Sequence, residues 1–112
     1  MSHHQISATD LYRLTQSQKE LIILDVRTPE EYKAVRIPHS YNLPIDQVTV
    51  ERVTSLLKER DQSVDTPIYI TCASGPRAIR ACEILEKNFK NVIHIVGCIN
   101  GWVHENLPVE KE

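Results

Sequence analysis

The strongest constraint on the fold is the alternation of short apolar runs with segments of helical periodicity. Apolar runs with little polar interruption occupy residues 21–26, 68–71 and 92–96, and a shorter run occupies residues 41–43. Runs of this length without polar alternation are typical of strands buried on both faces of a parallel sheet. Because helical stripes separate them, the chain predicts an α/β fold with helices on both faces of the sheet.

Helix start signals support this interpretation. Ser7 with Asp10 is typical of a helix cap, and Thr28 followed by Pro29 and two glutamates is typical of another. Apolar residues then recur at helical spacing within 50–57 and 78–85, and a short closing helix is expected within 99–104. We interpret the glutamates of these helices as solvent-facing residues.

Length and composition exclude several classes of protein. The 112 residues predict one domain over 1–112, with residues 1–5 as a frayed polar tail. A net charge of -2 and few aromatic residues argue against nucleic-acid binding. No apolar stretch approaches the ~18 residues of a membrane span. The absence of a long apolar seam makes a monomer the default expectation.

The cysteine pattern points to a reducing compartment. Cys72, Cys82 and Cys98 are odd in number, and none forms a Cys-x-x-Cys pair. A disulfide framework is therefore not expected, and a cytoplasmic location fits best. A zinc site is not expected either, because Cys82 lies on the apolar stripe of a helix and His94 lies within a strand as a packed or solvent-facing residue.

The strand ends hold the candidate chemistry. Ligands of open parallel sheets bind beyond the carboxyl ends of the strands. Arg27 follows one predicted strand, Cys72 ends a second, and Gly97 with Cys98 follows a third. We therefore expect these residues to gather at one edge of the molecule.

Cys72 is the candidate nucleophile because it lies at a strand-to-helix turn. Gly75 allows the backbone to curl, and Pro76 is preset for the first position of a helix. Such a turn directs backbone N–H groups toward the sulfur, although Pro76 has no N–H to donate. The helix N-terminus and the cation Arg77 should both lower the pKa of the thiol, so no general base is required.

Three ordered segments give the chain a resemblance to the single-domain rhodaneses over nearly its whole length. They are residues 24–32 (Leu-Asp-Val-Arg-Thr-Pro-Glu-Glu-Tyr), residues 72–77 (Cys-Ala-Ser-Gly-Pro-Arg), and Gly97 with residues 101–102 and 107–109. The resemblance implies a single rhodanese-like domain with a five-stranded, mostly parallel sheet flanked by helices on both faces. It also implies a sulfurtransferase that needs no cofactor or metal.

The resemblance assigns roles to the site residues. Cys72 would take a sulfane sulfur from a donor such as thiosulfate and pass it, as a persulfide, to a thiol or a sulfur-acceptor protein. The substrate-binding loop would comprise Ala73, Ser74, Gly75, Pro76 and Arg77, with Arg77 holding the anionic donor. Asp25 and Arg27 would have supporting, positioning roles.

Two departures from the family pattern stand out. Residues 35–40 read Val-Arg-Ile-Pro-His-Ser where relatives usually have Gly-His-Ile-Pro-Gly-Ala, which leaves open a role for Arg36 or His39. Cys98 stands where a second glycine often follows Gly97. Cys98 is interpreted either as a small apolar residue in a glycine position or as a thiol that resolves a persulfide on Cys72 into a disulfide.

Two other functions remain as alternatives. A cysteine phosphatase can share this fold, but its loop places five residues between cysteine and arginine, whereas residues 73–76 are four. A non-catalytic regulatory or docking module is the other alternative, although degenerate modules of this kind commonly lack the cysteine.

Overall fold

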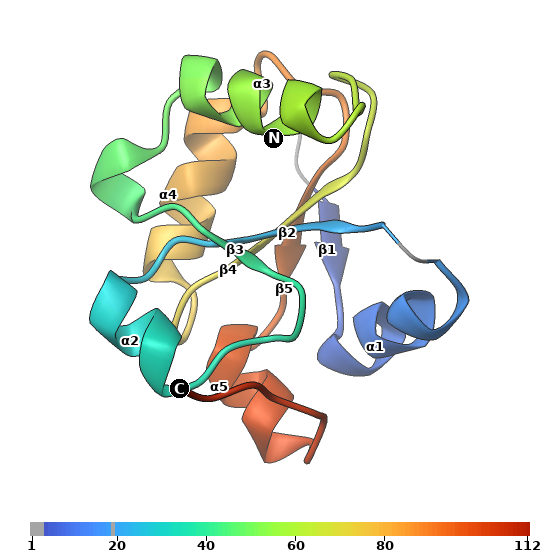
Figure 1. Ribbon diagram of the computed structural model, residues 1–112, viewed down its shortest axis with the longest axis vertical. Coiled ribbons are helices and arrows are strands. Elements are labelled where there is room, and N and C mark those ends of the chain that lie inside the picture. The colour runs from blue at the N-terminus through green and yellow to red at the C-terminus, as the bar shows by residue number, and fades with distance from the viewer. Residues whose placement is uncertain (1–3, 19) are drawn as a thin grey trace.

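A five-stranded parallel sheet forms the centre of the computed structural model, which describes residues 4–18 and 20–112 (Figure 1). The strand order is β1-β5-β4-β2-β3, and every pairing between neighbours is parallel. The strands are β1 (His4–Ile6), β2 (Ile22–Asp25), β3 (Tyr41–Asn42), β4 (Ile68–Thr71) and β5 (Val92–Ile95). The predicted α/β class and five-stranded sheet are confirmed.

Two helices begin at the predicted caps, Ser7 for α1 and Thr28 for α2, and α4 begins at Pro76 as predicted. They are α1 (Ala8–Ser17), α2 (Pro29–Ala34), α3 (Val50–Glu59), α4 (Pro76–Leu85) and α5 (Cys98–His104), with a 3-10 turn η1 (Ile45–Gln47). Thr28 and Glu31 form a reciprocal capping box at α2, in which each side chain accepts a backbone N–H of the other residue. No helix within residues 4–18 and 20–112 is long and apolar enough to cross a bilayer.

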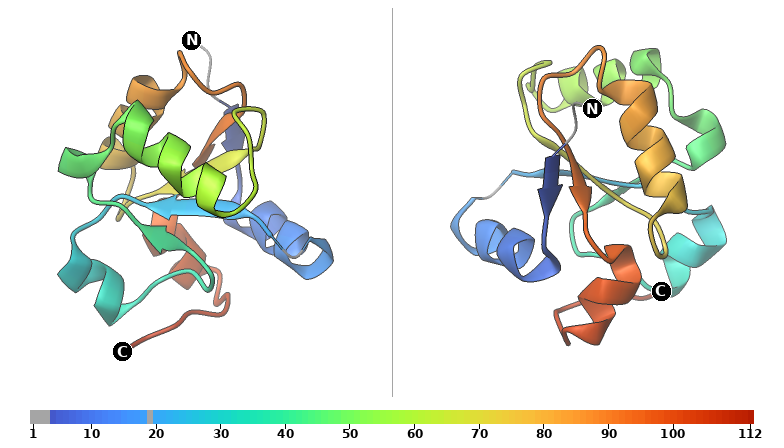
Figure 2. Two further views of the ribbon diagram at one scale, coloured as in Figure 1. Left: turned by 45° about the horizontal axis from the view of Figure 1, so that its top comes forward. Right: turned by 180° about the vertical axis from the view of Figure 1, so that it is seen from behind.

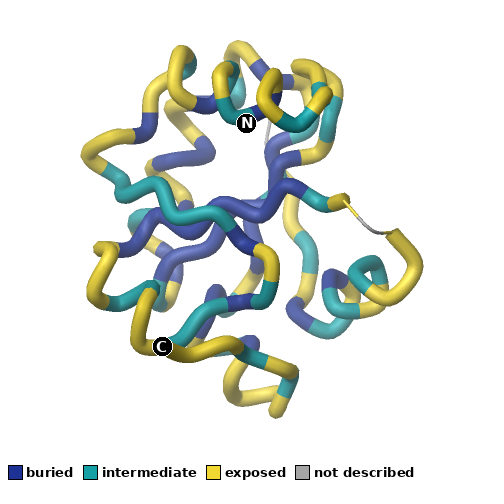
Figure 3. The backbone as a smooth tube through the Cα atoms, in the orientation of Figure 1, coloured by how far each residue is buried: buried dark blue, intermediate teal, exposed yellow. Residues whose placement is uncertain are grey.

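Each face of the sheet has its own apolar core, because successive side chains of a strand point to opposite faces. Ile68, Ile70 and Cys72 belong to the core that α3 and α4 cover, whereas Tyr69 belongs to the core that α1 and α5 cover. Figures 1 and 2 show these two pairs of helices on opposite sides of the sheet. The inner strands β2, β4 and β5 form the most buried part of the backbone, whereas the edge strands β1 and β3 are only partly buried or exposed (Figure 3).

The predicted frayed tail is wrong for His4 and Gln5. Both residues belong to β1, which pairs in register with Ile93 and His94 of β5, and residues 1–3 lie outside the described residues. Pairing of an edge strand depends on backbone hydrogen bonds and does not require apolar side chains, so the polar sequence gave no signal. His4 and Gln5 are accordingly exposed, and only Ile6 is partly buried.

His39 adopts a backbone conformation that favours glycine. Its φ of 67° lies in the left-handed region, where an L side chain crowds the following carbonyl. His39 follows Pro38 at the position where the family pattern usually has glycine, and its side chain is exposed. The chain therefore retains a glycine-type turn without its glycine.

His39→Gly should stabilise the fold, because glycine adopts this conformation without strain and the exposed imidazole contributes little packing. We expect the free energy of unfolding to rise by roughly 0.5–1 kcal/mol after the greater unfolded-state entropy of glycine is included. Urea denaturation measures the change. Glu83→Gly, at an exposed position inside α4, is the matched control and should destabilise by roughly 0.5–1 kcal/mol. Equal destabilisation by both variants would contradict the strain argument.

Candidate active site

The parallel register brings the ends of three adjacent strands together. β4 pairs with β2 on one side, where Thr71 lies opposite Asp25, and with β5 on the other, where Ile70 lies opposite His94. Arg27, Cys72 and Cys98 follow these strand ends at the same edge of the sheet. A backbone hydrogen bond of 3.0 Å from Val26 N to Thr71 O extends the pairing to the start of the loop.

The sulfur of Cys72 caps the N-terminus of α4. The N-cap residue is Gly75, which has no side chain to accept the free N–H groups of the first helical turn. Cys72 Sγ accepts the backbone N–H of Ala78 at 3.2 Å and that of Gly75 at 3.2 Å. A thiolate in this position is stabilised by two directed donors and by the positive end of the helix dipole.

Gly75 is required by its backbone conformation. Its φ of 149° and ψ of -45° lie in a region that L side chains rarely adopt, although a Cβ at this position would meet no atom within 4 Å. Pro76 then occupies the first helical position with its fixed φ. Gly75 and Pro76 together thus turn the chain from the end of β4 into α4 within the loop of residues 72–77.

Cys98 lies beside Cys72 at the same edge. The two sulfurs are 3.8 Å apart, and both side chains are buried, with 1% of Cys72 and 0% of Cys98 exposed. The Cys98 thiol as donor, followed by the backbone N–H groups of Ala78, Gly75 and Ser74, holds the pKa of Cys72 well below that of an ordinary thiol, against the opposing effect of burial. The negative sulfur and burial together raise the pKa of Cys98. The two backbone N–H groups at Cys72 Sγ agree with these directions, because they favour the charged form on that sulfur.

Arg77 pairs with Glu31, the N3 residue of α2. Two hydrogen bonds of 2.8 Å and 3.1 Å join its guanidinium to the two carboxylate oxygens. The side chains are 33% and 37% exposed, so the pair lies at the mouth of the loop. Arg77 lowers the pKa of Glu31 to about 2, with a further contribution from Thr28, and Glu31 raises the pKa of Arg77.

Asp25 and Arg27 form a buried ion pair that shapes the end of β2. Asp25 accepts the backbone N–H of Arg27 at 3.0 Å and its guanidinium at 2.7–3.1 Å. Arg27 also donates to Val35 O at 2.6 Å, and Asn42 Nδ2 donates to the carbonyl oxygens of both residues of the pair. This network fixes the chain between β2 and α2, which carries Glu31.

Sequence reasoning missed two contacts of this site. Glu31 was interpreted as a solvent-facing residue, but it binds Arg77, and a separation of 46 residues leaves no local signal for the pair. His94 was interpreted as a packed or solvent-facing residue; it is buried, and its Nε2 lies 3.7 Å from Cys98 Sγ. Successive side chains of β5 point to alternate faces of the sheet, and this alternation places His94 on the face that α4 covers. The same alternation, applied to the predicted strand, would have indicated this face from the sequence.

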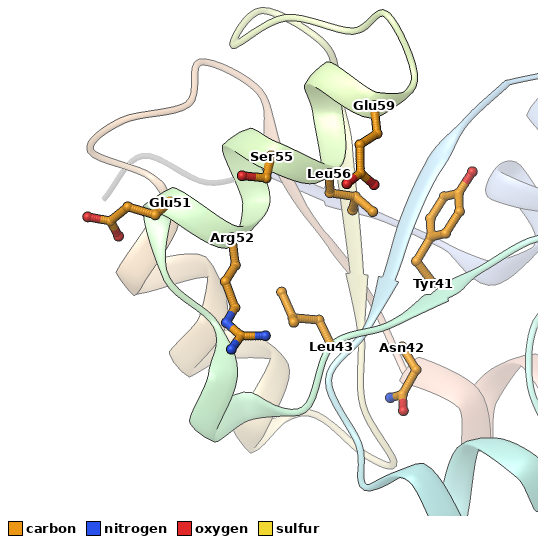
Figure 4. A pocket seen from close by; sticks show the side chains of 8 residues that line it. All are labelled: Tyr41, Asn42, Leu43, Glu51, Arg52, Ser55, Leu56 and Glu59. Carbon is orange, nitrogen blue, oxygen red and sulfur yellow. The ribbon is translucent and has the colours of Figure 1, made fainter.

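The cavity drawn in Figure 4 lies away from this loop. It has a volume of about 310 Å³ between α3 and β3. Its lining residues are Tyr41, Asn42, Leu43, Glu51, Arg52, Ser55, Leu56 and Glu59. The lining contains neither cysteine nor histidine, so we assign the nucleophilic chemistry to residues 72–77. In the described part of the chain, no group of three His, Cys, Asp or Glu side chains is arranged to hold a metal ion.

Fold and site define a class of protein: a parallel α/β domain with a buried thiol held at a helix N-terminus. Residues 7–105 match the family model of the rhodanese-like domain, and the chain belongs to this family. A crystal structure of a rhodanese-related protein from Thermoplasma volcanium has a TM-score of 0.78 and 30% identity, covering 98% of this chain and 100% of that chain.

Two curated relatives extend the comparison. A sulfurtransferase of Allochromatium vinosum is 26% identical over 107 residues, which cover 95% of this chain and 94% of the relative. The putative sulfur carrier protein YrkF of Bacillus subtilis is 35% identical over 99 residues, which cover 88% of this chain and 50% of YrkF. The chain thus spans nearly all of the first relative and half of the second. These matches support a rhodanese-type sulfurtransferase.

The Cys72 thiol should titrate below neutral pH, because the lowered pKa keeps the thiolate populated at all pH values above it. Ultraviolet thiolate absorbance of the native protein should therefore persist below pH 7 and disappear in Cys72→Ser. Cys98→Ala should move the titration upward by about one to two pKa units, the worth of one hydrogen bond to a charged group. Burial raises the pKa of Cys82 to about 12, so Cys82→Ser serves as the silent control. Titration of Cys72 near the ordinary value would contradict the capping argument.

Glu31→Gln should destabilise the protein only where Glu31 is charged. The folded-state pKa of about 2 lies below the ordinary 4.5, so the stabilisation is complete above pH 4.5 and is lost as the pH falls toward 2. Because the pair is more than a third exposed, we expect a loss below about 1 kcal/mol at pH 7. Glutamine retains the capping box, and Glu30→Gln controls for helix charge. Urea unfolding of both variants at several pH values gives the result, and a difference that persists at pH 2 would refute the ion-pair origin.

Proposed function

We propose that the protein is a sulfurtransferase that carries sulfane sulfur as a persulfide on Cys72. The observation that supports this most is the position of Cys72 Sγ, which accepts two backbone N–H groups at the N-terminus of α4. This arrangement stabilises an anionic sulfur without a neighbouring general base. The same two donors suit a persulfide anion, whose negative charge lies on the sulfur bonded directly to Cys72 Sγ.

Thiosulfate fits the chemistry of the donor. The Cys72 thiolate attacks the sulfane sulfur of thiosulfate, a new S–S bond forms, the S–S bond of thiosulfate breaks, and sulfite leaves with the electron pair. Cyanide then takes the outer sulfur, which releases thiocyanate and restores the thiolate. In the cell, a thiol or a sulfur-acceptor protein would replace cyanide, and the similarity to a putative sulfur carrier protein agrees with such an acceptor.

Arg77 is proposed to hold the anionic donor at the mouth of the loop. Its guanidinium has five N–H donors, of which two bind Glu31. Glu31 thus orients the guanidinium and leaves N–H groups for a second anion. A reducing cytoplasm would keep Cys72 in its reduced form and is the compartment that we propose.

Two features weigh against the alternative functions. A phosphatase loop must surround a tetrahedral phosphate with N–H donors, whereas here only four residues separate Cys72 from Arg77 and one of them, Pro76, lacks an N–H. A non-catalytic docking module has no need for a thiol with a lowered pKa. The stabilised thiolate of Cys72 therefore favours catalysis over docking.

Incubation of the reduced protein with thiosulfate should add one sulfur atom to the chain. Intact-mass spectrometry should detect it in the wild type and in Cys82→Ser but not in Cys72→Ser, and cyanide should discharge it as thiocyanate. Arg77→Lys should raise the KM for thiosulfate severalfold, because a point charge replaces an oriented planar donor. A folded, reduced protein that takes sulfur from neither thiosulfate nor a low-molecular-weight persulfide would overturn the proposal in favour of a docking module.

A further inference from the structure

Cys98 occupies a strained backbone position beside the nucleophile. Its φ is 53°, in the left-handed region, and it follows Gly97, whose φ is 81°. A non-glycine residue in this region is strained, and such strain tends to be retained where a side chain serves a function. Here the retained side chain is a buried thiol whose sulfur lies 3.8 Å from Cys72 Sγ.

Backbone hydrogen bonds hold the two cysteines in this arrangement. Ile99 N donates to Cys72 O at 3.0 Å, and Asn100 N donates to Ala73 O at 3.1 Å. The first turn of α5 is therefore tied to the start of the loop. Because a disulfide bond is about 2.05 Å long, the two sulfurs must approach by roughly 1.8 Å to form one.

His94 lies next to the Cys98 sulfur. Its Nε2 is 3.7 Å from Cys98 Sγ, and the residue is buried in β5. Cys72, Cys98 and His94 thus form a chain of contacts inside the α4 face of the sheet. An imidazole nitrogen in this position is a suitable acceptor for the proton that Cys98 must lose before it acts as a nucleophile.

We propose that Cys98 is a resolving cysteine that converts the Cys72 persulfide into a Cys72–Cys98 disulfide and releases sulfide. This inference rests on the proposed function, because it requires sulfur on Cys72. Resolution by Cys98 would give the bound sulfur a second way to leave the protein, because it is released as sulfide when no acceptor is present. The disulfide then blocks Cys72 until an external thiol reduces it.

The step balances without an added oxidant. Cys98 gives its proton to His94 Nε2, and the Cys98 thiolate attacks Cys72 Sγ. A bond forms between the two cysteine sulfurs, and the bond between Cys72 Sγ and the outer sulfur breaks. The outer sulfur keeps the electron pair of the broken bond, takes up the proton that Cys98 released, and leaves as hydrosulfide. It is reduced, the Cys98 sulfur is oxidised, and Cys72 Sγ keeps its oxidation state because it exchanges one S–S bond for another.

The addition of sulfur to Cys72 also favours the thiolate form of Cys98, which is the form that attacks. The Cys72 thiolate raises the pKa of Cys98 in the unloaded protein, so Cys98 remains protonated and acts as a donor. Once Cys72 carries sulfur, its own sulfur is bonded on both sides and the negative charge lies on the outer atom. The largest cause of the raised pKa then weakens, and Cys98 loses its proton more readily.

The test follows the mass of the fully reduced chain after loading with thiosulfate, without cyanide or added thiol. We expect a transient gain of one sulfur atom, then a species lacking two hydrogen atoms relative to the reduced chain, with one sulfide released per chain. Peptide mapping should join Cys72 to Cys98, and dithiothreitol should restore the reduced mass. Cys82→Ser should behave as the wild type does.

Two variants of Cys98 keep the test decisive if one of them folds poorly. Cys98→Ser preserves the size of the side chain, and Cys98→Gly removes the backbone strain. Both should load sulfur and retain it over the period in which the wild type loses it. His94→Gln should slow the conversion of the persulfide to the disulfide, whereas a merely structural role for His94 would leave that step unchanged.

A second loading reagent separates this inference from the proposed function. Inorganic polysulfide modifies thiolates without catalysis, so it loads Cys72 even if thiosulfate is not a substrate, and the mass is read after desalting. Loading by polysulfide alone, followed by disulfide formation, would support this inference and refute thiosulfate as donor. A wild-type persulfide as durable as that of Cys98→Ser would refute this inference and leave sulfur transfer intact. A chain that takes sulfur from neither reagent would overturn both.

Discussion

Pairing of β4 on both sides is the constraint on which the remaining structure depends. Its four residues are buried; all four pair with β2, and three of them pair with β5, in parallel register. Parallel strands end at the same edge, so three chain segments must leave the sheet side by side. The segment after β4 reaches α4 within a few residues, which fixes the sulfur of Cys72 against the first turn of that helix.

Helix capping and thiolate stabilisation are the same interaction in this site. The N–H of Ala78 needs an acceptor because the N-cap residue, Gly75, has no side chain. Cys72 Sγ supplies that acceptor, and the unmet helix terminus in turn favours the charged form of the sulfur. The stability of α4 and the reactivity of Cys72 are therefore coupled, since a change at the sulfur alters the cap of the helix.

Local sequence signals predicted most of the fold and the centre of the site. Buried apolar runs and the caps at Ser7 and Thr28 depend on residues that are neighbours in the chain, so they can be recognised directly in the sequence. β1 escaped prediction because edge pairing uses backbone groups, and the Arg77–Glu31 pair escaped because its partners belong to different helices. The Cys72–Cys98 approach was open from sequence, because only the order of β4 and β5 in the sheet decides whether the two thiols meet.

His39 and Cys98 show that the same backbone strain has different meanings in different surroundings. Both are non-glycine residues at φ values near 60°, and both stand where the family pattern often has glycine. The side chain of His39 is exposed, so a substitution by glycine that relaxes its backbone would remove little packing. The side chain of Cys98 is buried between Cys72 and His94, with its backbone tied to the active loop. Replacing it by glycine would relieve strain but remove the thiol that lies 3.8 Å from Cys72 Sγ, so strain at Cys98 is coupled to the surroundings of that sulfur.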